Sequence, residues 1–432
     1  MKTLIISSNC SGGGKTTFTL GLMNALKNRG YEVQGFKSGP DYIDTAFHTD
    51  ITGKASRNLD IFLMGEEGVK ASFSRGEGDL AIVEGVMGLY DGKGITDDYS
   101  TYSVSKVLDN APIVLVITPK AQSLTICAEI NGIKNFRDAN IVGVVLNNVS
   151  DSYYNLLKKL IEEHCKIKVF GYIPRNEKLK LESRHLGLVQ SVEVSNIKEK
   201  IDLCSELIEK YVDVDSLISS FKDIKKSEDR FHLKPINKRI AVAYDEAFRF
   251  YYKENLELLE EIGEVIYFSP LRDRELPKNI DFLYLGGGYP EVFKDRLNEN
   301  KSMLKSIKDA LDNGLNCYAE CGGLMYLMAD IDGEKLVGFF NGNSEMTNTL
   351  NRFGYAIIDV DNIKINCHEF HKSKVNTNEK AIYNIEKVGF DDKKISWNCG
   401  YKKNNTLAGY PHVHFFGNLE FLKYILNWKE EK

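Results

Sequence analysis

A glycine-rich loop near the start of the chain has the residue types that hold phosphate groups. Residues 8–16 (SNCSGGGKT) follow a short apolar run and precede a helical pattern. Glycine N–H groups at a helix start can bind phosphate oxygens, while the following lysine reaches the outer phosphates and the threonine hydroxyl ligates Mg²⁺. We therefore predict a site for ATP and Mg²⁺, with nucleotide contacts from Gly12, Gly13, Gly14, Lys15, Thr16 and Thr17.

Acidic side chains follow two further apolar runs in the same half of the chain. Residues 36–44 (FKSGPDYID) place Lys37, Asp41 and Asp44 after one run, and Glu84 ends another. An isolated aspartate in a turn is most often a solvated capping residue. The carboxyl ends of parallel strands meet at one edge of a sheet, however, and carboxylates gathered there can hold Mg²⁺ beside a phosphoryl group. The position of these side chains therefore favours a metal–nucleotide site.

A cysteine in the second half lies in the pattern of an activated nucleophile. Residues 318–323 (YAECGG) follow an apolar run and precede a helical one, so a sharp turn should expose the thiol of Cys321. The thiol needs a base, and residues 409–415 (GYPHVHF) offer His412 and His414. The two histidines alternate as on a strand, so only one should face the site, and we assign this role to His412. The N–H groups of an oxyanion hole are assigned to Gly287, Gly288 and Gly322.

The composition indicates a soluble globular protein that binds small molecules. The chain of 432 residues has a net charge of -5, which gives no sign of nucleic-acid binding. It has no run of about 18 apolar residues that would span a membrane. Its 8 cysteines include no CxxC pair, which is typical of reduced thiols in the cytoplasm. Five of them are expected to be inert packing residues: Cys127, Cys165, Cys204, Cys317 and Cys399.

Two series of apolar runs alternate with helical patterns, which predicts an α/β fold with two doubly wound domains. The expected strands are residues 3–8, 32–36, 80–83, 113–117, 142–146 and 168–172 in the first series, and 239–243, 264–267, 281–285 and 316–319 in the second. A helix is expected from the spacing of Phe18, Leu22 and Leu26, with its end at Gly30. We predict a first domain at 1–220, a linker at 221–238 and a second domain at 239–432.

Long segments of the chain resemble the cobyrinic acid a,c-diamide synthase family, and the match runs nearly from end to end. The matching segments are FKSGPDYID, EGVMGLYDG, ESRHLGLV, YDEAFRFYY, YLGGGYPEVF, YAECGGLMYL, CHEFHKS and GYPHVHF. The resemblance implies a phosphate-loop domain like that of dethiobiotin synthetases, followed by a class I glutamine amidotransferase domain. It implies a ligase that phosphorylates the a and c acetate carboxylates of a corrinoid with ATP. Ammonia released from L-glutamine would then convert the acyl phosphates to amides.

The resemblance also implies roles for individual residues of the first half. Mg²⁺ would be held by Thr16, Asp41 and Glu84, and Asp44 would share the metal or orient the carboxylate. The phosphate ligands would be Lys15 and Lys37.

Three further implications concern the nucleotide base, the tetrapyrrole substrate and the glutaminase. Asn147 would lie near the base, although an asparagine at a strand end is as often a turn former. Tyr42 and Ile43 would meet the tetrapyrrole. The glutaminase family lacks the usual acidic third member of the triad, for which Glu291 and Asp281 are both open candidates. A homodimer is left open as well.

Other functions share part of these motifs. A nickel-sirohydrochlorin or hydrogenobyrinic acid a,c-diamide synthase would share nearly all of them and differ in the macrocycle accepted. A partition-type ATPase, which is a nucleotide switch, carries a signature lysine five residues before the lysine of the loop, where this chain has Cys10. A glutaminase-like scaffold without catalysis would not need Cys321 and His412. We therefore expect an enzyme acting on a tetrapyrrole, without membrane or nucleic-acid partners.

Overall fold

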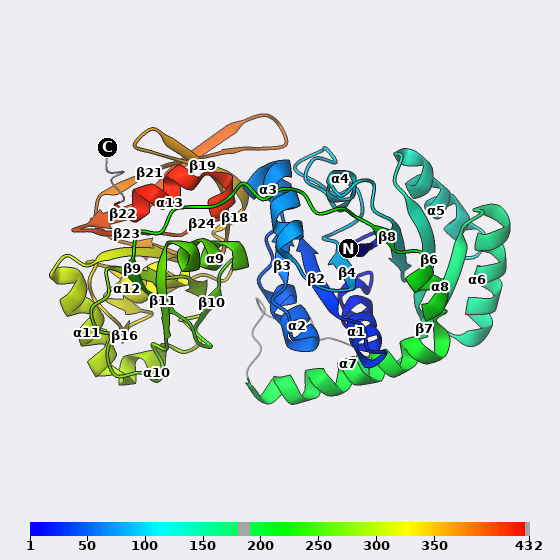
Figure 1. Ribbon diagram of the computed structural model, residues 1–432, viewed down its shortest axis with the longest axis horizontal. Coiled ribbons are helices and arrows are strands. Elements are labelled where there is room, and N and C mark those ends of the chain that lie inside the picture. The colour runs from blue at the N-terminus through cyan, green and yellow to red at the C-terminus, as the bar shows by residue number, and fades with distance from the viewer. Residues whose placement is uncertain (180–190, 428–432) are drawn as a thin grey trace. The chain divides into compact units, whose positions relative to one another are not determined.

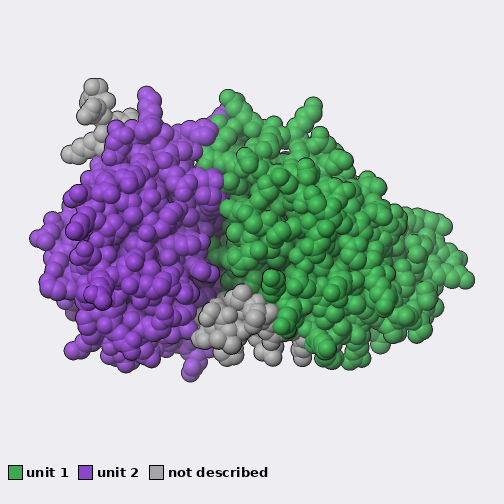
Figure 2. Space-filling model, turned by 60° about the horizontal axis from the view of Figure 1, so that its bottom comes forward, with its two compact units in different colours: residues 1–61, 66–229 green, residues 62–65, 230–432 purple. Residues whose placement is uncertain are grey.

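The computed structural model describes residues 1–179 and 191–427. The segment ESRHLGLV, at residues 182–189, lies outside the described residues. The chain divides into two compact units, one of residues 1–61 and 66–229 and the other of residues 62–65 and 230–432 (Figure 2).

The first unit is built on an 8-stranded sheet with the order β3-β2-β4-β1-β5-β6-β7, in which all these neighbours are parallel. Strand β8 pairs with β1 in the antiparallel direction. The strands are β1 (Lys2–Ser8), β2 (Val33–Ser38), β3 (Arg57–Leu59), β4 (Leu80–Glu84), β5 (Ile113–Ile117), β6 (Ile141–Val149), β7 (Lys168–Pro174) and β8 (Lys222–Asp223).

Three strands of this sheet are buried on both faces, although only β5 is apolar throughout. Every residue of β2, β4 and β5 is buried, as expected of a parallel sheet covered by helices on both sides. The helices are α1 (Lys15–Asn28), α2 (Ile43–Thr52), α3 (Ile61–Arg75), α4 (Thr101–Val107), α5 (Thr125–Phe136), α6 (Asp151–His164), α7 (Ser191–Tyr211) and α8 (Val214–Ser219). Figure 1 shows α7 running beside α1.

Helix α1 buries the face that its sequence spacing predicted. Phe18, Leu22 and Leu26 are at most 1% exposed and join the core of the first unit. The helix ends at Asn28, and Gly30 follows with φ +89°, a left-handed conformation that glycine adopts without strain. The predicted helix and its end are therefore confirmed.

The second unit contains a 10-stranded sheet with the order β11-β9-β12-β14-β23-β22-β21-β18-β19-β24. The first five strands are parallel to one another, and the remaining pairs are antiparallel. These strands are β9 (Lys238–Ala243), β11 (Gly263–Phe268), β12 (Phe282–Leu285), β14 (Asn316–Glu320), β18 (Arg352–Val360), β19 (Ile363–His371), β21 (Ala381–Val388), β22 (Lys394–Lys403), β23 (Thr406–Gly409) and β24 (His412–Val413). The predicted α/β fold of both halves is confirmed, and the antiparallel extension is an addition to it.

Smaller elements complete the second unit (Figure 1). One short sheet pairs β10 (Phe248–Phe250) with β13 (Gly287–Gly288), and another has the order β16-β15-β17-β20. Its strands are β15 (Asp330–Ile331), β16 (Glu334–Lys335), β17 (Asn343–Met346) and β20 (Ser373–Asn376). The helices are α9 (Lys253–Ile262), α10 (Lys294–Glu299), α11 (Lys301–Asp312), α12 (Gly322–Leu327) and α13 (Leu419–Ile425). Within the described part of the chain, we find no helix with the length and apolar character needed to cross a bilayer.

Candidate active sites

The phosphate loop connects β1 to α1 and is supported by two side chains from neighbouring strands. Thr118, after β5, donates from Oγ1 to the carbonyl of Gly13 at 3.1 Å, and Asn147 donates to Thr118 at 2.9 Å. Gly14 has φ +90°, and an added Cβ there would lie 2.3 Å from Nδ2 of Asn147. The loop therefore requires glycine at this position. Asn147 contacts the loop itself, and its predicted place near the nucleotide base stays a prediction.

Two buried lysines lie at this end of the sheet. Lys15 is 7% exposed and donates to the carbonyls of Cys10 at 3.1 Å and Met87 at 2.6 Å. Burial and the positive charge of Lys37 lower the pKa of Lys15. An anion between the two ammonium groups would remove this repulsion, so the loop is suited to a polyphosphate.

Glu84, the last residue of β4, is fully buried and receives hydrogen bonds at both carboxylate oxygens. Its Oε1 accepts from Thr16 at 2.6 Å and from Lys37 at 3.1 Å. Its Oε2 lies 2.8 Å from Nε2 of His48. Burial alone would raise the pKa of Glu84, but the Lys37 ammonium and the His48 hydrogen bond hold it well below its usual range. Glu84 is therefore a carboxylate at neutral pH.

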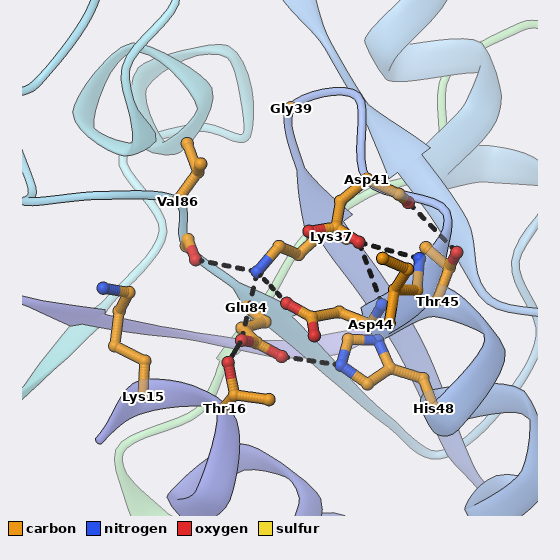
Figure 3. Close-up of polar contacts among 12 residues, drawn as sticks. Lys15, Thr16, Lys37, Gly39, Asp41, Asp44, Thr45, His48, Glu84 and Val86 are labelled. Atoms are coloured by element: carbon orange, nitrogen blue, oxygen red, sulfur yellow. Dashed lines mark hydrogen bonds and ion pairs between the residues drawn. The ribbon is translucent and has the colours of Figure 1, made fainter. Parts of the chain in front are cut away.

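Lys37 lies between two carboxylates, as Figure 3 shows. It donates to Oδ2 of Asp44 at 2.5 Å as well as to Glu84. Burial and the charge of Glu84 raise the pKa of Asp44, because two carboxylates share one ammonium. Asp44 lies in the first turn of α2, so the turn after β2 places it beside the end of β4.

Asp41 is turned toward the start of α2. Its Oδ1 accepts from the backbone N–H groups of Ile43 at 2.8 Å and Asp44 at 2.9 Å. These bonds satisfy donors that a helix start leaves free. The structure thus brings Thr16, Glu84, Lys37 and Asp44 into direct contact, with Asp41 at the edge of the group.

His48 was not identified from the sequence, yet it is part of this cluster. It is fully buried, and its Nδ1 lies 3.1 Å from Oγ of Ser56, which in turn donates to the carbonyl of Gly35 at 3.0 Å. Ser56 can therefore only accept from the ring, which orients His48 so that Nε2 faces Glu84. The only sequence signal was a histidine on the buried face of α2, one turn after Asp44.

The oxygen donors present fit a magnesium ion. In residues 1–179 and 191–427, no three His, Cys, Asp or Glu side chains are grouped as metal ligands. Mg²⁺ usually takes one or two protein carboxylates and completes its shell with waters and phosphate oxygens. The Thr16 hydroxyl and the Glu84 carboxylate, in contact at 2.6 Å, are such hard donors.

The two residues predicted to meet the substrate precede and begin α2. Tyr42 is the residue before the helix, and Ile43 is its first residue. Both are partly exposed at the same turn that carries Asp41 and Asp44. Their contact with a tetrapyrrole stays a prediction.

Cys321 of the second unit lies at a strained turn between β14 and α12. Its backbone has φ +47° and ψ -99°, a conformation that L-residues rarely adopt. Its N–H donates to the carbonyl of Gly409 at 2.7 Å, which fixes the turn against β23. The thiol is 7% exposed. This is the geometry of a nucleophile elbow.

His412 contacts both Cys321 and Glu320. The ring is hydrogen-bonded to Cys321, and its Nδ1 lies 3.3 Å from Oε2 of Glu320. Burial alone would lower the pKa of His412, but the negative charges of Cys321 and Glu320 raise it to about 10. The raised pKa favours the imidazolium form of His412 at neutral pH, a form that can donate a proton to a leaving group.

The glycines predicted to form the oxyanion hole lie against these residues. An added Cβ at Gly287 would be 2.4 Å from Cε1 of His412. An added Cβ at Gly322 would be 3.0 Å from the backbone nitrogen of Gly288. Glycine at 287 thus allows the backbone to approach His412, and glycine at 322 allows the approach to Gly288, while the oxyanion role of the three glycines stays a prediction.

The remaining candidates of this unit lie elsewhere or have other partners. His414 Nε2 lies 3.3 Å from Oε2 of Glu254, and its Nδ1 accepts from the N–H of Phe416 at 3.2 Å. Asp281 accepts from the N–H of Arg239 at 2.8 Å, at the opposite end of β12 from Gly286. Burial raises the pKa of Glu291 to about 7, with the nearby charge of Asp332 adding to the effect. His414 therefore has a structural environment, and Asp281 lies too far along the strand to meet His412.

Most other cysteines are buried, as their sequence context predicted. Cys127, Cys165, Cys204, Cys317 and Cys399 all lie in the interior, whereas Cys10 is exposed. Burial raises the pKa of Cys165, Cys204 and Cys399 to about 12, so these thiols stay protonated at neutral pH.

Two family models match most of the chain. Residues 4–189 match the model of the CobQ/CobB/MinD/ParA nucleotide binding domain. Residues 239–419 match the CobB/CobQ-like glutamine amidotransferase domain. The phosphate loop and Cys321 lie in the first and the second of these ranges, respectively.

Three curated relatives cover nearly the whole chain, and each bears the name cobyrinate a,c-diamide synthase. The protein of Clostridium acetobutylicum is 64% identical over 99% of this chain and 100% of its own. That of Clostridium tetani is 60% identical over 99% and 100% of the two chains, and that of Listeria innocua is 42% identical over 97% of each. The chain belongs to the cobyrinate a,c-diamide synthase family.

Proposed function

We propose that the protein converts the a and c acetate carboxylates of cobyrinic acid to amides, with ATP for activation and L-glutamine as nitrogen donor. The observation that carries this proposal is the presence of two complete groups in one chain. The first unit holds Lys15, Lys37, Thr16 and Glu84 around a phosphate loop. The second holds Cys321 hydrogen-bonded to His412 beside Gly287. The names of the relatives supply the substrate.

The first step joins a carboxylate oxygen of the substrate to the γ-phosphorus of ATP. The bond from that phosphorus to the bridging oxygen breaks, and ADP leaves. Lys15 and Lys37 would offset the negative charge on the phosphoryl oxygens while the phosphoryl group passes from ADP to the carboxylate oxygen. Mg²⁺, held by Thr16 and Glu84 with Asp41 or Asp44 nearby, would neutralise further charge on the phosphates. The product is an acyl phosphate, which has a good leaving group where the carboxylate had none.

The second unit would supply the nitrogen. Cys321 attacks the side-chain carbonyl of glutamine, and His412 protonates the departing ammonia. Water then releases glutamate from the thioester. Neutral ammonia attacks the carbon of the acyl phosphate, phosphate leaves, and an amide remains. The sequence of steps runs once for each of the two carboxylates.

The ends of the two domains are part of the proposal. We propose a synthetase domain at 1–220, a linker at 221–238 and an amidotransferase domain at 239–432. The described contacts divide the chain between residues 229 and 230. We also propose that the enzyme works in the cytoplasm, where ATP and glutamine are available.

Assay of the substrates directly tests this function. Purified protein with ATP, Mg²⁺ and glutamine should convert cobyrinic acid to a product two amides richer. Nickel-sirohydrochlorin and hydrogenobyrinic acid should react far more slowly. A preference for either of these macrocycles would reassign the substrate and leave the chemistry in place.

A second measurement tests the intermediate. Substrate carboxylates labelled with ¹⁸O should transfer one labelled oxygen to inorganic phosphate for each amide formed. Amide formation without label in phosphate would exclude the acyl phosphate, even if every residue named above proved essential.

A further inference from the structure

The carboxylate beside His412 comes from the residue that precedes the nucleophile. Glu320 is the last residue of β14 and is 1% exposed, so its side chain is enclosed within the second unit. Its Oε2 lies 3.3 Å from Nδ1 of His412, which is 92 positions away in the sequence. Strand β14 lies next to β23, and Glu320 is in register with Gly409. The chain therefore brings the carboxylate and the imidazole together from two adjacent strand ends.

Among the ion pairs of the described residues, the one that includes the buried Glu320 is its pair with His412. The neighbouring phenols of Tyr284 and Tyr318 are buried, and their pKa values lie well above the usual range because of burial and the charge of Glu320. These phenols cannot neutralise a carboxylate. Burying a charge is costly unless it is paired, so a fold that keeps this glutamate needs the positive form of His412.

The imidazole of His412 contacts a carboxylate as well as the thiol. Nδ1 faces Glu320, and the ring is also hydrogen-bonded to Cys321. A carboxylate at Nδ1 selects the tautomer that carries a proton there and stabilises the imidazolium. Nε2 is then the nitrogen that takes the thiol proton and later delivers it to ammonia.

We propose that Glu320 is the positioning residue of the glutaminase, so that the reacting group is a Cys321–His412–Glu320 triad. The inference rests on the proposed glutaminase function and adds the acid that the sequence motifs left open. Asp281 is held at the far end of β12 by the N–H of Arg239.

The second buried histidine–glutamate pair of this unit provides a matched control. Glu254 and His414 are both fully buried, with Oε2 of Glu254 also 3.3 Å from the histidine. Neither contacts Cys321 among the hydrogen bonds described for this unit. Glu254→Gln therefore removes the same charge from the same kind of pair, away from the thiol.

The test compares Glu320→Gln with Glu254→Gln in the full-length protein, by glutamine hydrolysis over a range of pH. Glu320→Gln should lower kcat by at least about tenfold and change KM for glutamine much less, because the substrate does not touch Glu320. Catalysis needs the imidazolium, which is present below the pKa of His412 and lost above it. Removal of the Glu320 charge lowers this pKa, so the fall in activity at high pH should begin at a lower pH. Glu254→Gln should keep the wild-type profile.

Amidation with ammonium salts in place of glutamine distinguishes the outcomes. Glu320→Gln should keep this activity within about twofold of wild type, because free ammonia bypasses the glutaminase. The triad would be overturned if Glu320→Gln had the wild-type kcat and lost activity at the same high pH as the wild type. Wild-type protein that hydrolyses no glutamine would overturn the proposed function instead. If Glu320→Gln fails to fold, Glu320→Asp is the deciding variant. Its shorter side chain lengthens the contact to His412, so the fall in activity at high pH should begin at a lower pH, by a smaller amount than in Glu320→Gln. If that fall is not displaced in Glu320→Asp, the proposed role of Glu320 is wrong.

Discussion

The hydroxyl of Thr16 donates a 2.6 Å hydrogen bond to Oε1 of Glu84, which joins the first turn of α1 to the end of β4 across 68 positions of sequence. Both groups are also the hard oxygen donors that we propose for Mg²⁺. The first prediction concerns the acidic side chains of the proposed metal site. Glu84→Ala or Asp41→Ala should reduce amidation at least about a hundredfold, with glutamine and with ammonia alike, because activation precedes either donor.

Glutamine hydrolysis serves as the internal control for these variants. It should persist, since Cys321 belongs to the other unit. Initial rates of amide formation and of glutamate release, measured in the same samples, check both statements. Loss of amidation with glutamine only would show that Glu84 does not serve the activation step.

The second prediction concerns the nucleophile. Cys321→Ser should abolish glutamine-driven amidation and leave the ammonia-driven reaction largely intact, because a serine hydroxyl is far less readily ionised. Cys317→Ser, four positions earlier and within β14, is the matched control and should keep glutamine-driven activity. Equal loss with both nitrogen donors in Cys321→Ser would mean that the thiol has another task.

The third prediction separates the two histidines of β24 and its flank. His412→Asn should behave as Cys321→Ser does, because the thiol loses its base and ammonia its proton donor. His414→Asn should retain glutaminase activity but unfold at a lower temperature, since the buried contact between His414 and Glu254 is lost, at a cost of about 1–3 kcal/mol. Activity and thermal unfolding of both variants test this, and a reversed pattern would exchange the two assignments.

The fourth prediction concerns His48, whose two nitrogens can be replaced one at a time. The amide of Asn reaches about as far as Nδ1 and that of Gln about as far as Nε2. His48→Asn should therefore keep the contact to Ser56, lose the contact to Glu84, and lower kcat for amidation roughly tenfold with either donor. His48→Gln should be closer to wild type. Equal effects of the two variants on kcat would show that the contact between His48 and Glu84 does not determine the rate of amidation.

Elements marked by a run of consecutive residues of one kind could be predicted from the sequence. Strand β5 is a continuous apolar run, β4 is one up to Glu84, and the loop before α1 has its glycines and lysine in consecutive order. Strand β3 was missed because its three residues include Arg57 and Asn58, whose burial depends on their neighbours. The antiparallel strands such as β18 were missed because only one face is buried, at Ala356, Ile358 and Val360, and no apolar run results.

The contacts within the sites needed the fold. His48 and Glu84 are 36 positions apart, and Glu320 and His412 are 92 positions apart. No spacing rule connects such residues. Glu320 stood next to the nucleophile in the motif, but its direction depends on the register between β14 and β23. Asn147 was expected after a strand but lies within β6, and its closeness to Gly14 follows from how near the phosphate loop passes to this strand.

The strained backbone of Cys321 implies that the protein is less stable because of the residue that its glutaminase needs. Its φ of +47° with ψ of -99° is a region that only glycine occupies freely, at a cost of about 1–3 kcal/mol for other residues. Glycine normally destabilises a protein relative to alanine by roughly 0.5–1 kcal/mol. At this turn the glycine variant should be at least as stable as the alanine variant. Cys321→Gly should therefore unfold at or above the melting temperature of Cys321→Ala. Neither variant can hydrolyse glutamine. A Cys321→Gly variant that is inactive but thermally more stable would thus show how much stability the protein loses by holding the catalytic sulfur in this strained turn.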